Sequence, residues 1–140
     1  SDFAYSAGYG VISGADPISV SKGGGVGSIG VMMIIADLQK AAKKEGVSFT
    51  ILRSAARKAI GAGGIEPMDS QEIAKYQSEI DEAGQMFAET IARHRGIEVQ
   101  AVLGTEGKTL RPSEALEIGL VDSVDSIYDI WRTFQPVHNA

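Results

Sequence analysis

The sequence predicts an α/β fold. Short apolar segments typical of strands alternate along the chain with segments whose apolar residues recur at helical spacing. Apolar residues make up 44% of the 140 positions, which is enough for a hydrophobic core and too many for a disordered chain. The length suits one ordinary domain, and we find neither an internal repeat nor an interdomain linker. We therefore expect one α/β layer structure with some parallel strand pairing.

The first part of the chain predicts a helix followed by two strands. Residues 4–15 are rich in alanine and glycine, which favours a short helix that packs closely against a neighbouring backbone. Asp16-Pro17 ends it, because the residue before proline avoids the helical region. Residues 18–20 predict a short strand, and a glycine-rich loop then leads to a buried strand that opens the apolar segment 26–35.

The middle of the chain predicts a helix, a strand and an irregular segment. Residues 37–45 form the expected helix, and Gly46 is a suitable C-cap. Apolar residues at alternate positions predict a strand over 47–52. The segment 53–68 contains three glycines and a proline, so we expect irregular structure there.

The last part of the chain predicts a long amphipathic helix and several shorter elements. Asp69 or Ser70 caps the long helix, and Gly96 ends it. Its apolar stripe, at spacings of three, four or seven residues, consists of Ile73, Tyr76, Ile80, Phe87 and Ile91. The shorter elements are expected at 99–103 and 112–118 (helices), 119–122 (strand or turn) and 125–134 (a terminal amphipathic helix that includes Phe134).

Composition excludes several classes of function. The net charge of −5 leaves no basic face for phosphates, which argues against nucleic-acid binding. The absence of cysteine excludes disulfides, thiolate nucleophiles and cysteine-bound zinc. Residues 1–5 do not resemble a signal peptide, and the longest apolar stretch, 29–36, is too short to span a bilayer. Because the chain lacks an initiator methionine, we expect it to be a piece of a longer protein.

Histidine and glycine patterns exclude two further chemistries. The two histidines are His94, expected on a solvated helix end, and His138, so a Ser–His–Asp triad and a metal-dependent hydrolase are not supported. The loop 23–28 lacks the Gly-Lys-Ser/Thr ending of a nucleotide-binding loop. We expect neither a cofactor nor a metal.

Ser6 and Lys58 are the candidates for covalent catalysis. A neutral lysine can activate a serine, but only where its surroundings bring a pKa that is normally ~10.4 down to roughly 7–8. Ser6 lies near the start of a predicted helix, and Lys58 lies in a weakly charged patch beside Arg57, a cation that favours a neutral amine. Packing for the serine and solvent exposure for the lysine stay open as alternatives.

Several segments together resemble the signal peptide peptidase A (protease IV) family of serine peptidases. The segments 4–9 and 13–16 resemble its nucleophile signature, 26–31 its second signature, 52–58 its lysine segment and 115–122 its C-terminal signature. The segments 86–92 and 95–96 look most like the phage capsid-protease members. The four signatures occur in the family's order and cover nearly the whole chain, so together they are far more specific than any one alone.

The resemblance implies a fold and a mechanism. It implies the C-terminal part of a ClpP/crotonase-like α/β domain, in which Ser6 attacks the scissile carbonyl, Lys58 takes its proton and Ser28 orients the lysine. Ala55 stands where the family often has glycine, which is a mild departure. The family places strands and a glycine-rich oxyanion segment before the nucleophile. We therefore expect a single partial peptidase domain over 1–140, inactive by itself.

The resemblance also implies partners and a location. We expect a protein or peptide substrate and a homo-oligomeric ring, in which one subunit or two neighbouring subunits supply the serine and the lysine. The leading hypothesis is a cytoplasmic phage or prophage endopeptidase that cleaves scaffold or capsid proteins. The alternatives are a bacterial signal peptide peptidase, held at the membrane by an upstream segment, a crotonase-like acyl-CoA-binding protein, and a non-catalytic assembly module.

Overall fold

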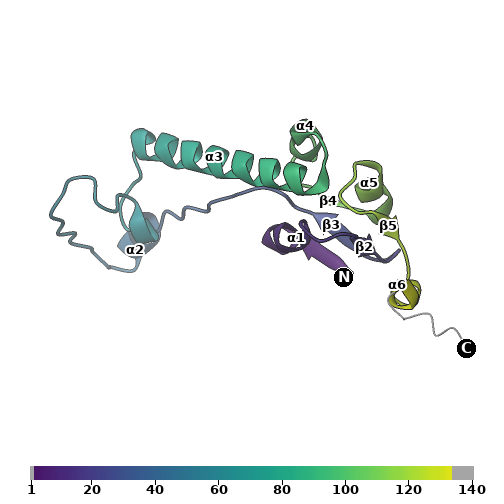
Figure 1. Ribbon diagram of the computed structural model, residues 1–140. Helices are drawn as coiled ribbons and strands as arrows, with labels where there is room; N and C mark the ends of the chain where they lie inside the picture. The colour runs from purple at the N-terminus through teal and green to yellow at the C-terminus, as the bar shows by residue number, and fades with distance from the viewer. Residues whose placement is uncertain (1, 134–140) are drawn as a thin grey trace, which may run out of the picture. The chain divides into compact units, whose positions relative to one another are not determined.

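The computed structural model describes residues 2–133, which fall into two compact units (Figure 1). Unit 1 comprises Ser1–Gly30 and Ala83–Ala140, and unit 2 comprises Val31–Glu82. That both belong to one peptidase domain of a longer protein stays a prediction.

Unit 1 contains two small sheets. In the first, β1 (Phe3–Tyr5) pairs in parallel with β3 (Gly25–Gly27), and β3 pairs antiparallel with β4 (Thr109–Leu110). In the second, β2 (Ser19–Val20) pairs in parallel with β5 (Ser123–Val124). The expected mixture of helices and strands with parallel pairing is therefore confirmed.

Four short helices accompany these strands. Their bounds are Ala7–Ile12 for α1, Val99–Leu103 for α4, Pro112–Glu117 for α5 and Ile127–Thr133 for α6. Local signals explain α5: proline occupies its first position, and the Glu114 carboxylate accepts a 2.8 Å hydrogen bond from the Arg111 N–H. The predicted bounds of α4 are confirmed, and α6 begins two residues later than expected. Phe134, the predicted end of that last helix, lies outside the described residues.

The start of the chain corrects one prediction. The helix expected over 4–15 begins only at Ala7, because residues 3–5 form the strand β1 instead. The hydrogen bonds of β1 go to β3, about twenty residues away along the chain, so the local abundance of alanine and glycine gave no sign of them.

The long helix α3 (Ser70–Arg95) starts in unit 2 and ends in unit 1 (Figure 1). Its first turn is capped by Asp69, whose Oδ1 accepts a 2.8 Å hydrogen bond from the Glu72 N–H. Gly96 takes a φ of +65° directly after its last residue, as expected for a helix-ending glycine. Within the described residues, neither α3 nor any other helix combines the length and the hydropathy needed to cross a bilayer.

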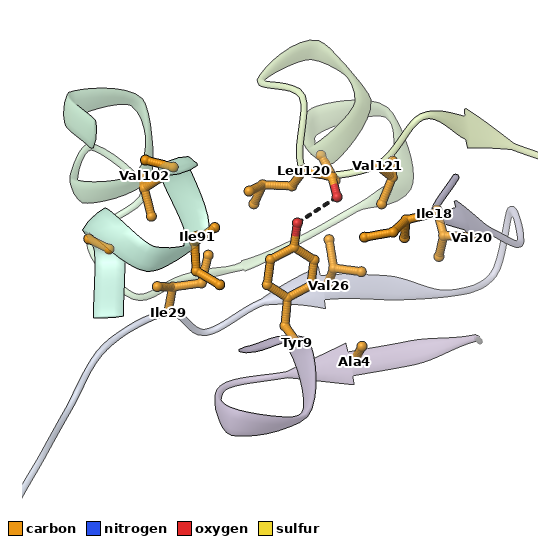
Figure 2. Packing of buried hydrophobic residues seen from close by; sticks show 13 residues of the cluster. Ala4, Tyr9, Ile18, Val20, Val26, Ile29, Ile91, Val102, Leu120 and Val121 are labelled. Carbon is orange, nitrogen blue, oxygen red and sulfur yellow. Dashed lines mark hydrogen bonds between the residues drawn. The ribbon is translucent and has the colours of Figure 1, made fainter. Parts of the chain in front are cut away.

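The hydrophobic core lies in unit 1. Every buried apolar side chain among the described residues belongs to this unit: Ala4, Tyr9, Ile18, Val20, Val26, Ile29, Ala88, Ile91, Ala92, Val102, Ala115, Leu120 and Val121. Figure 2 shows the Tyr9 ring in the middle of this cluster, with its hydroxyl donating a 2.6 Å hydrogen bond to the Leu120 carbonyl. Burial raises the pKa of Tyr9 to about 12, so the phenol remains a hydrogen-bond donor.

Unit 2 contains the helix α2 (Gln39–Lys44) and a single 3₁₀ turn, η1 (Ala62–Gly64), and none of its described residues forms a strand. The strand predicted over 47–52 is therefore wrong, and the strand predicted to open 26–35 ends at Gly27. Alternating apolar residues make a strand only when a partner strand takes up the backbone hydrogen bonds, and these segments pair with none of the described residues. The large apolar side chains of residues 31–35 and 47–52 are exposed.

Candidate active site

Ser6 lies at a turn between a strand and a helix. It follows β1 directly and precedes α1, with φ +52° and ψ −129°. Its N–H donates a 2.8 Å hydrogen bond to the Gly27 carbonyl, and its own carbonyl accepts one of 3.0 Å from the Gly10 N–H. A positive φ is costly for a residue other than glycine and persists where the surrounding structure imposes it. The side chain is exposed at this turn, so its hydroxyl is accessible.

Ser28 lies beside Ser6 at the same edge of the sheet. The two serines directly follow Tyr5 and Gly27, which are register partners in the parallel strands β1 and β3. The Ser28 N–H donates a 2.8 Å hydrogen bond to the Lys108 carbonyl, and its φ is also positive, at +53°. The structure therefore brings together two of the three predicted site residues.

Glycine is required at the end of β3. Gly27 has a φ of +109°, and a Cβ there would lie 2.7 Å from the Lys108 carbonyl oxygen. A side chain would push β4 away from β3 and with it the carbonyl that binds Ser28. The glycine of the second signature thus serves the backbone that carries Ser28.

Lys58 lies on an irregular loop of unit 2. Its N–H donates a 3.0 Å hydrogen bond to the Ala55 carbonyl, and the next residue, Ala59, takes a positive φ of +57°. The lysine lines a cavity of about 360 Å³. The other lining residues are Ile51, Leu52, Arg53, Ser54, Ala59, Ala62, Ile65 and Glu66.

Lys58 and the two serines belong to different units. Ser6 and Ser28 lie in unit 1, whereas Lys58 lies in unit 2, and each unit has its own internal geometry. The pairing of Lys58 with Ser6, within one subunit or between two, therefore stays a prediction.

Arg57 is engaged by carboxylates. Its Nη2 lies 2.7 Å from Glu72 Oε2 and 3.2 Å from Asp69 Oδ1 at the start of α3. These hydrogen bonds, that with Glu72 first, raise the pKa of Arg57, and the pKa of Asp69 is lowered by the Glu72 N–H and by Arg57. The two carboxylates offset the positive charge that the sequence placed next to Lys58.

Sequence reasoning missed a contact of His94. Its Nδ1 lies 2.8 Å from the Oγ of Ser13, 81 positions earlier in the chain. Ser13 is completely buried, and its hydroxyl donates to the Gly10 carbonyl at 2.8 Å, which leaves it no access to a substrate. This pair joins the end of α1 to α3, and no local pattern could have revealed it. The other histidine, His138, lies outside the described residues.

The C-terminal signature is anchored to the end of α3. Arg95 Nη2 lies 2.7 Å from Asp122 Oδ1, and Arg95 Nε donates a 3.1 Å hydrogen bond to the Gly119 carbonyl. Asp122 also accepts a 2.7 Å hydrogen bond from the Ile18 N–H. The Arg95 guanidinium, followed by the Ile18 amide, lowers the pKa of Asp122. In this structure the signature therefore packs and ties together the secondary elements of unit 1.

Known proteins resemble the chain in sequence. Over 124 residues it is 36% identical to the capsid assembly protease C of Escherichia phage lambda, covering 88% of this chain and 28% of that protein. Over 104 residues it is 35% identical to the head-tail preconnector protein GP5 of Enterobacteria phage P21, covering 74% of this chain and 21% of that protein. The chain thus spans about a quarter of the length of these relatives.

One solved structure and one family model complete the comparison. A membrane-bound stomatin-specific protease matches 93% of this chain and 49% of its own at 16% identity and a TM-score of 0.49, a likeness from which we draw no argument. The model of peptidase family S49 matches residues 1–136, almost the whole chain. Together with the signatures around Ser6, Ser28 and Lys58, this match establishes that the chain belongs to peptidase family S49.

Proposed function

We propose that this chain is the catalytic part of a serine endopeptidase in which Ser6 is the nucleophile, Lys58 the general base and Ser28 the residue that orients the lysine. The observation that carries the proposal is the backbone of Ser6, which is held at a positive φ between a strand and a helix in a member of a peptidase family. Ser28 follows the neighbouring strand and adds support. The ClpP/crotonase-like architecture is part of the same proposal.

The proposed chemistry proceeds by acyl transfer. The neutral Lys58 amine takes the hydroxyl proton as Ser6 Oγ bonds to the scissile carbonyl carbon, and that proton passes to the departing amine as the peptide C–N bond breaks. Water then attacks the acyl-serine, gives a proton to the lysine and releases the new carboxylic acid with regeneration of the Ser6 hydroxyl. Ser28 would hold the lysine by a hydrogen bond so that its lone pair faces Ser6.

The proposed substrates are scaffold or capsid proteins of a phage or prophage, cleaved in the cytoplasm. Support comes from the name of the lambda relative, a capsid assembly protease. A bacterial signal peptide peptidase is the alternative within the family. The two are distinguished by measuring how fast the full-length protein, in detergent, hydrolyses cleaved signal peptides and phage scaffold protein. Faster hydrolysis of the scaffold protein would favour the phage function, and faster hydrolysis of signal peptides the alternative.

We also propose that the active protein is a homo-oligomer, with a ring as the expected arrangement. Unit 2 exposes a series of large apolar side chains, among them Met32, Ile34 and Leu52, and it has no buried apolar residue of its own among the described residues. Exposed apolar surface on this scale is typical of a protein interface.

The decisive experiment measures casein or fluorogenic-peptide hydrolysis by the full-length protein across pH. We expect Ser6→Ala and Lys58→Ala each to lower kcat by roughly 10³-fold or more, and Ser28→Ala by less, since it acts through the lysine. The wild-type rate should rise with pH as a basic group loses its proton. Exposed serine and lysine residues elsewhere provide matched controls, Ser78→Ala and Lys40→Ala, which should keep wild-type activity. Full activity in Ser6→Ala or in Lys58→Ala would rule out the dyad.

A second experiment tests the oligomer. Leu52→Asp, at a side chain 92% exposed, should weaken self-association at least tenfold, or about 1.4 kcal/mol. Val11→Asp, at a comparably exposed apolar residue of unit 1, serves as the control. Sedimentation velocity measures both. Equal association of Leu52→Asp and wild type would remove unit 2 from the interface.

A further inference from the structure

A single carboxylate closes the loop that carries Lys58. Glu66 Oε1 accepts a 2.6 Å hydrogen bond from Arg53 Nη2 and one of 3.1 Å from the Gly61 N–H. Arg53 lies five residues before the lysine and Gly61 three residues after it. One oxygen atom therefore joins the two flanks of Lys58, and both ion-pair partners are largely shielded, with side chains 19% and 22% exposed.

The loop needs such an anchor because its backbone has little regular structure. Between Arg53 and Glu66 the chain forms turns and the short 3₁₀ turn η1, with positive φ values at Ala59 (+57°) and Gly61 (+75°). Holding an exposed irregular segment in one conformation costs conformational entropy. Without internal contacts that offset this cost, the loop would place Lys58 in many positions. The Glu66 contacts supply restraint on both sides of it.

The same pair brings one positive and one negative charge to the cavity that Lys58 lines. Arg53, Lys58 and Glu66 are the charged residues that line one cavity, whose remaining walls are aliphatic except for Ser54. Arg57, the neighbour of Lys58, is engaged instead by Asp69 and Glu72. The hydrogen bond from Arg53, and secondarily that from the Gly61 N–H, lowers the pKa of Glu66, so its carboxylate stays ionised through neutral and alkaline pH.

We propose that Arg53 and Glu66 are positioning residues for Lys58: together they hold its loop closed and keep the charge beside its amine balanced. This inference rests on the proposed function, since it concerns the base of that reaction. Neither residue is expected to touch the substrate's reacting atoms.

The test compares Arg53→Gln, Glu66→Gln and the double variant in the full-length protein, with kcat/KM for a fluorogenic peptide measured from pH 6 to 11. Glu66→Gln leaves the Arg53 cation unbalanced, which favours the neutral amine, so the rise of the rate should move to lower pH by roughly half to one unit. Arg53→Gln leaves the Glu66 anion unbalanced, and the rise should move to higher pH by a similar amount. The double variant should return close to the wild-type midpoint with a lower kcat, because the loop has lost its anchor.

A matched control and a second measurement make the outcome decisive. Glu79→Gln, which breaks an exposed ion pair with Lys75 on α3, should leave the pH profile unchanged. The rate at which trinitrobenzenesulfonate modifies Lys58, followed by mass spectrometry, reports the same midpoints even in variants of low activity. Shifts in the same direction for both single variants, or no shift in either assay, would overturn the proposal. Activity retained in Ser6→Ala would instead overturn the proposed function, and the two failures are therefore distinguishable.

Discussion

The two units of the chain differ in whether they bury their apolar side chains. In unit 1, strands and helices from both ends of the sequence enclose a core around Tyr9 and Ile91. In unit 2, residues such as Ile34 and Leu52 remain on the surface, and irregular backbone predominates. Unit 1 therefore packs apolar side chains in a core of its own, whereas the contacts within unit 2 are those of helices, turns and ion pairs such as Arg53–Glu66.

The difference matters because the proposed dyad is divided between them. Ser6 lies on unit 1, which contains the core and in which strand pairing and helix formation fix its backbone. Lys58 lies on the unit whose apolar surface is open. We infer that the chain's own folding places the proposed nucleophile, whereas the loop of the proposed base is held within unit 2 by Arg53 and Glu66 and is completed by contacts in the full-length protein.

The largest expected difference between the units comes from replacing one apolar side chain by alanine in each. Ile91→Ala removes a fully buried side chain from the core of unit 1 and should lower the free energy of unfolding by about 2–5 kcal/mol. Leu52→Ala, at an exposed position of unit 2, should change it by less than about 0.5 kcal/mol in dilute protein. Urea unfolding followed by circular dichroism measures both. A comparable loss for Leu52→Ala would mean that unit 2 is covered in the full-length protein.

A smaller effect should come from the hydrogen bond inside the core. Tyr9→Phe keeps the ring but leaves the buried Leu120 carbonyl without this donor, which should cost about 1–3 kcal/mol. The same urea experiment measures it. Tyr9 lies on α1, three residues after Ser6, and the phenylalanine ring keeps the packing of that helix. Activity at low denaturant should therefore persist. An unchanged stability would show that water or another donor replaces the phenol.

The smallest expected loss of stability comes from replacing an aspartate that an arginine keeps ionised. Each unit offers one such aspartate. Because the pKa of Asp122 is lowered in the folded state, its contribution is present above the unfolded pKa of ~3.9 and is lost as the pH falls through the folded value. Asp122→Asn should therefore destabilise the protein by about 1 kcal/mol near pH 7, a figure discounted for the partly exposed carboxylate. The loss should shrink progressively as the pH falls below ~4 toward the lowered pKa of the folded state.

Asp69 provides the counterpart in unit 2. Its pKa is also lowered, but it caps the first turn of α3, which belongs to unit 2 and is not part of the core of unit 1. Asp69→Asn should increase hydrogen exchange in the first turn of α3 and leave the midpoint of global unfolding in place. A global shift as large as that of Asp122→Asn would show that the two units unfold together.

Elements set by local chemistry were predicted well from the sequence. The bounds of α4 and the ends of α3 follow from nearby signals, such as the Asp69 cap and the helix-ending Gly96. The strands β1 and β4 were missed because each is two or three residues long and exists through partners far along the chain. The strand expected at 47–52 failed for the complementary reason: its pattern was right for a strand, but no partner lies among the described residues.

For the candidate site, the sequence supplied candidate residues but not their arrangement. Ser6 and Ser28 could be named from the family signatures, and register then explains why they lie at one sheet edge. The Arg53–Glu66 pair and the contact between Ser13 and His94 join residues 13 and 81 positions apart. Neither pair has a spacing that marks it in the sequence, so both required the folded structure.

At position 6, folding stability and the proposed catalysis favour different residues. A φ of +52° and a ψ of −129° suit glycine better than serine, and holding serine there costs on the order of 1 kcal/mol or more. Folding alone would thus favour glycine at this position, and only chemistry would retain the hydroxyl. In a lineage that had lost catalysis but kept this fold, drift should replace Ser6 with glycine, so the residue found there would record whether peptide cleavage is still under selection.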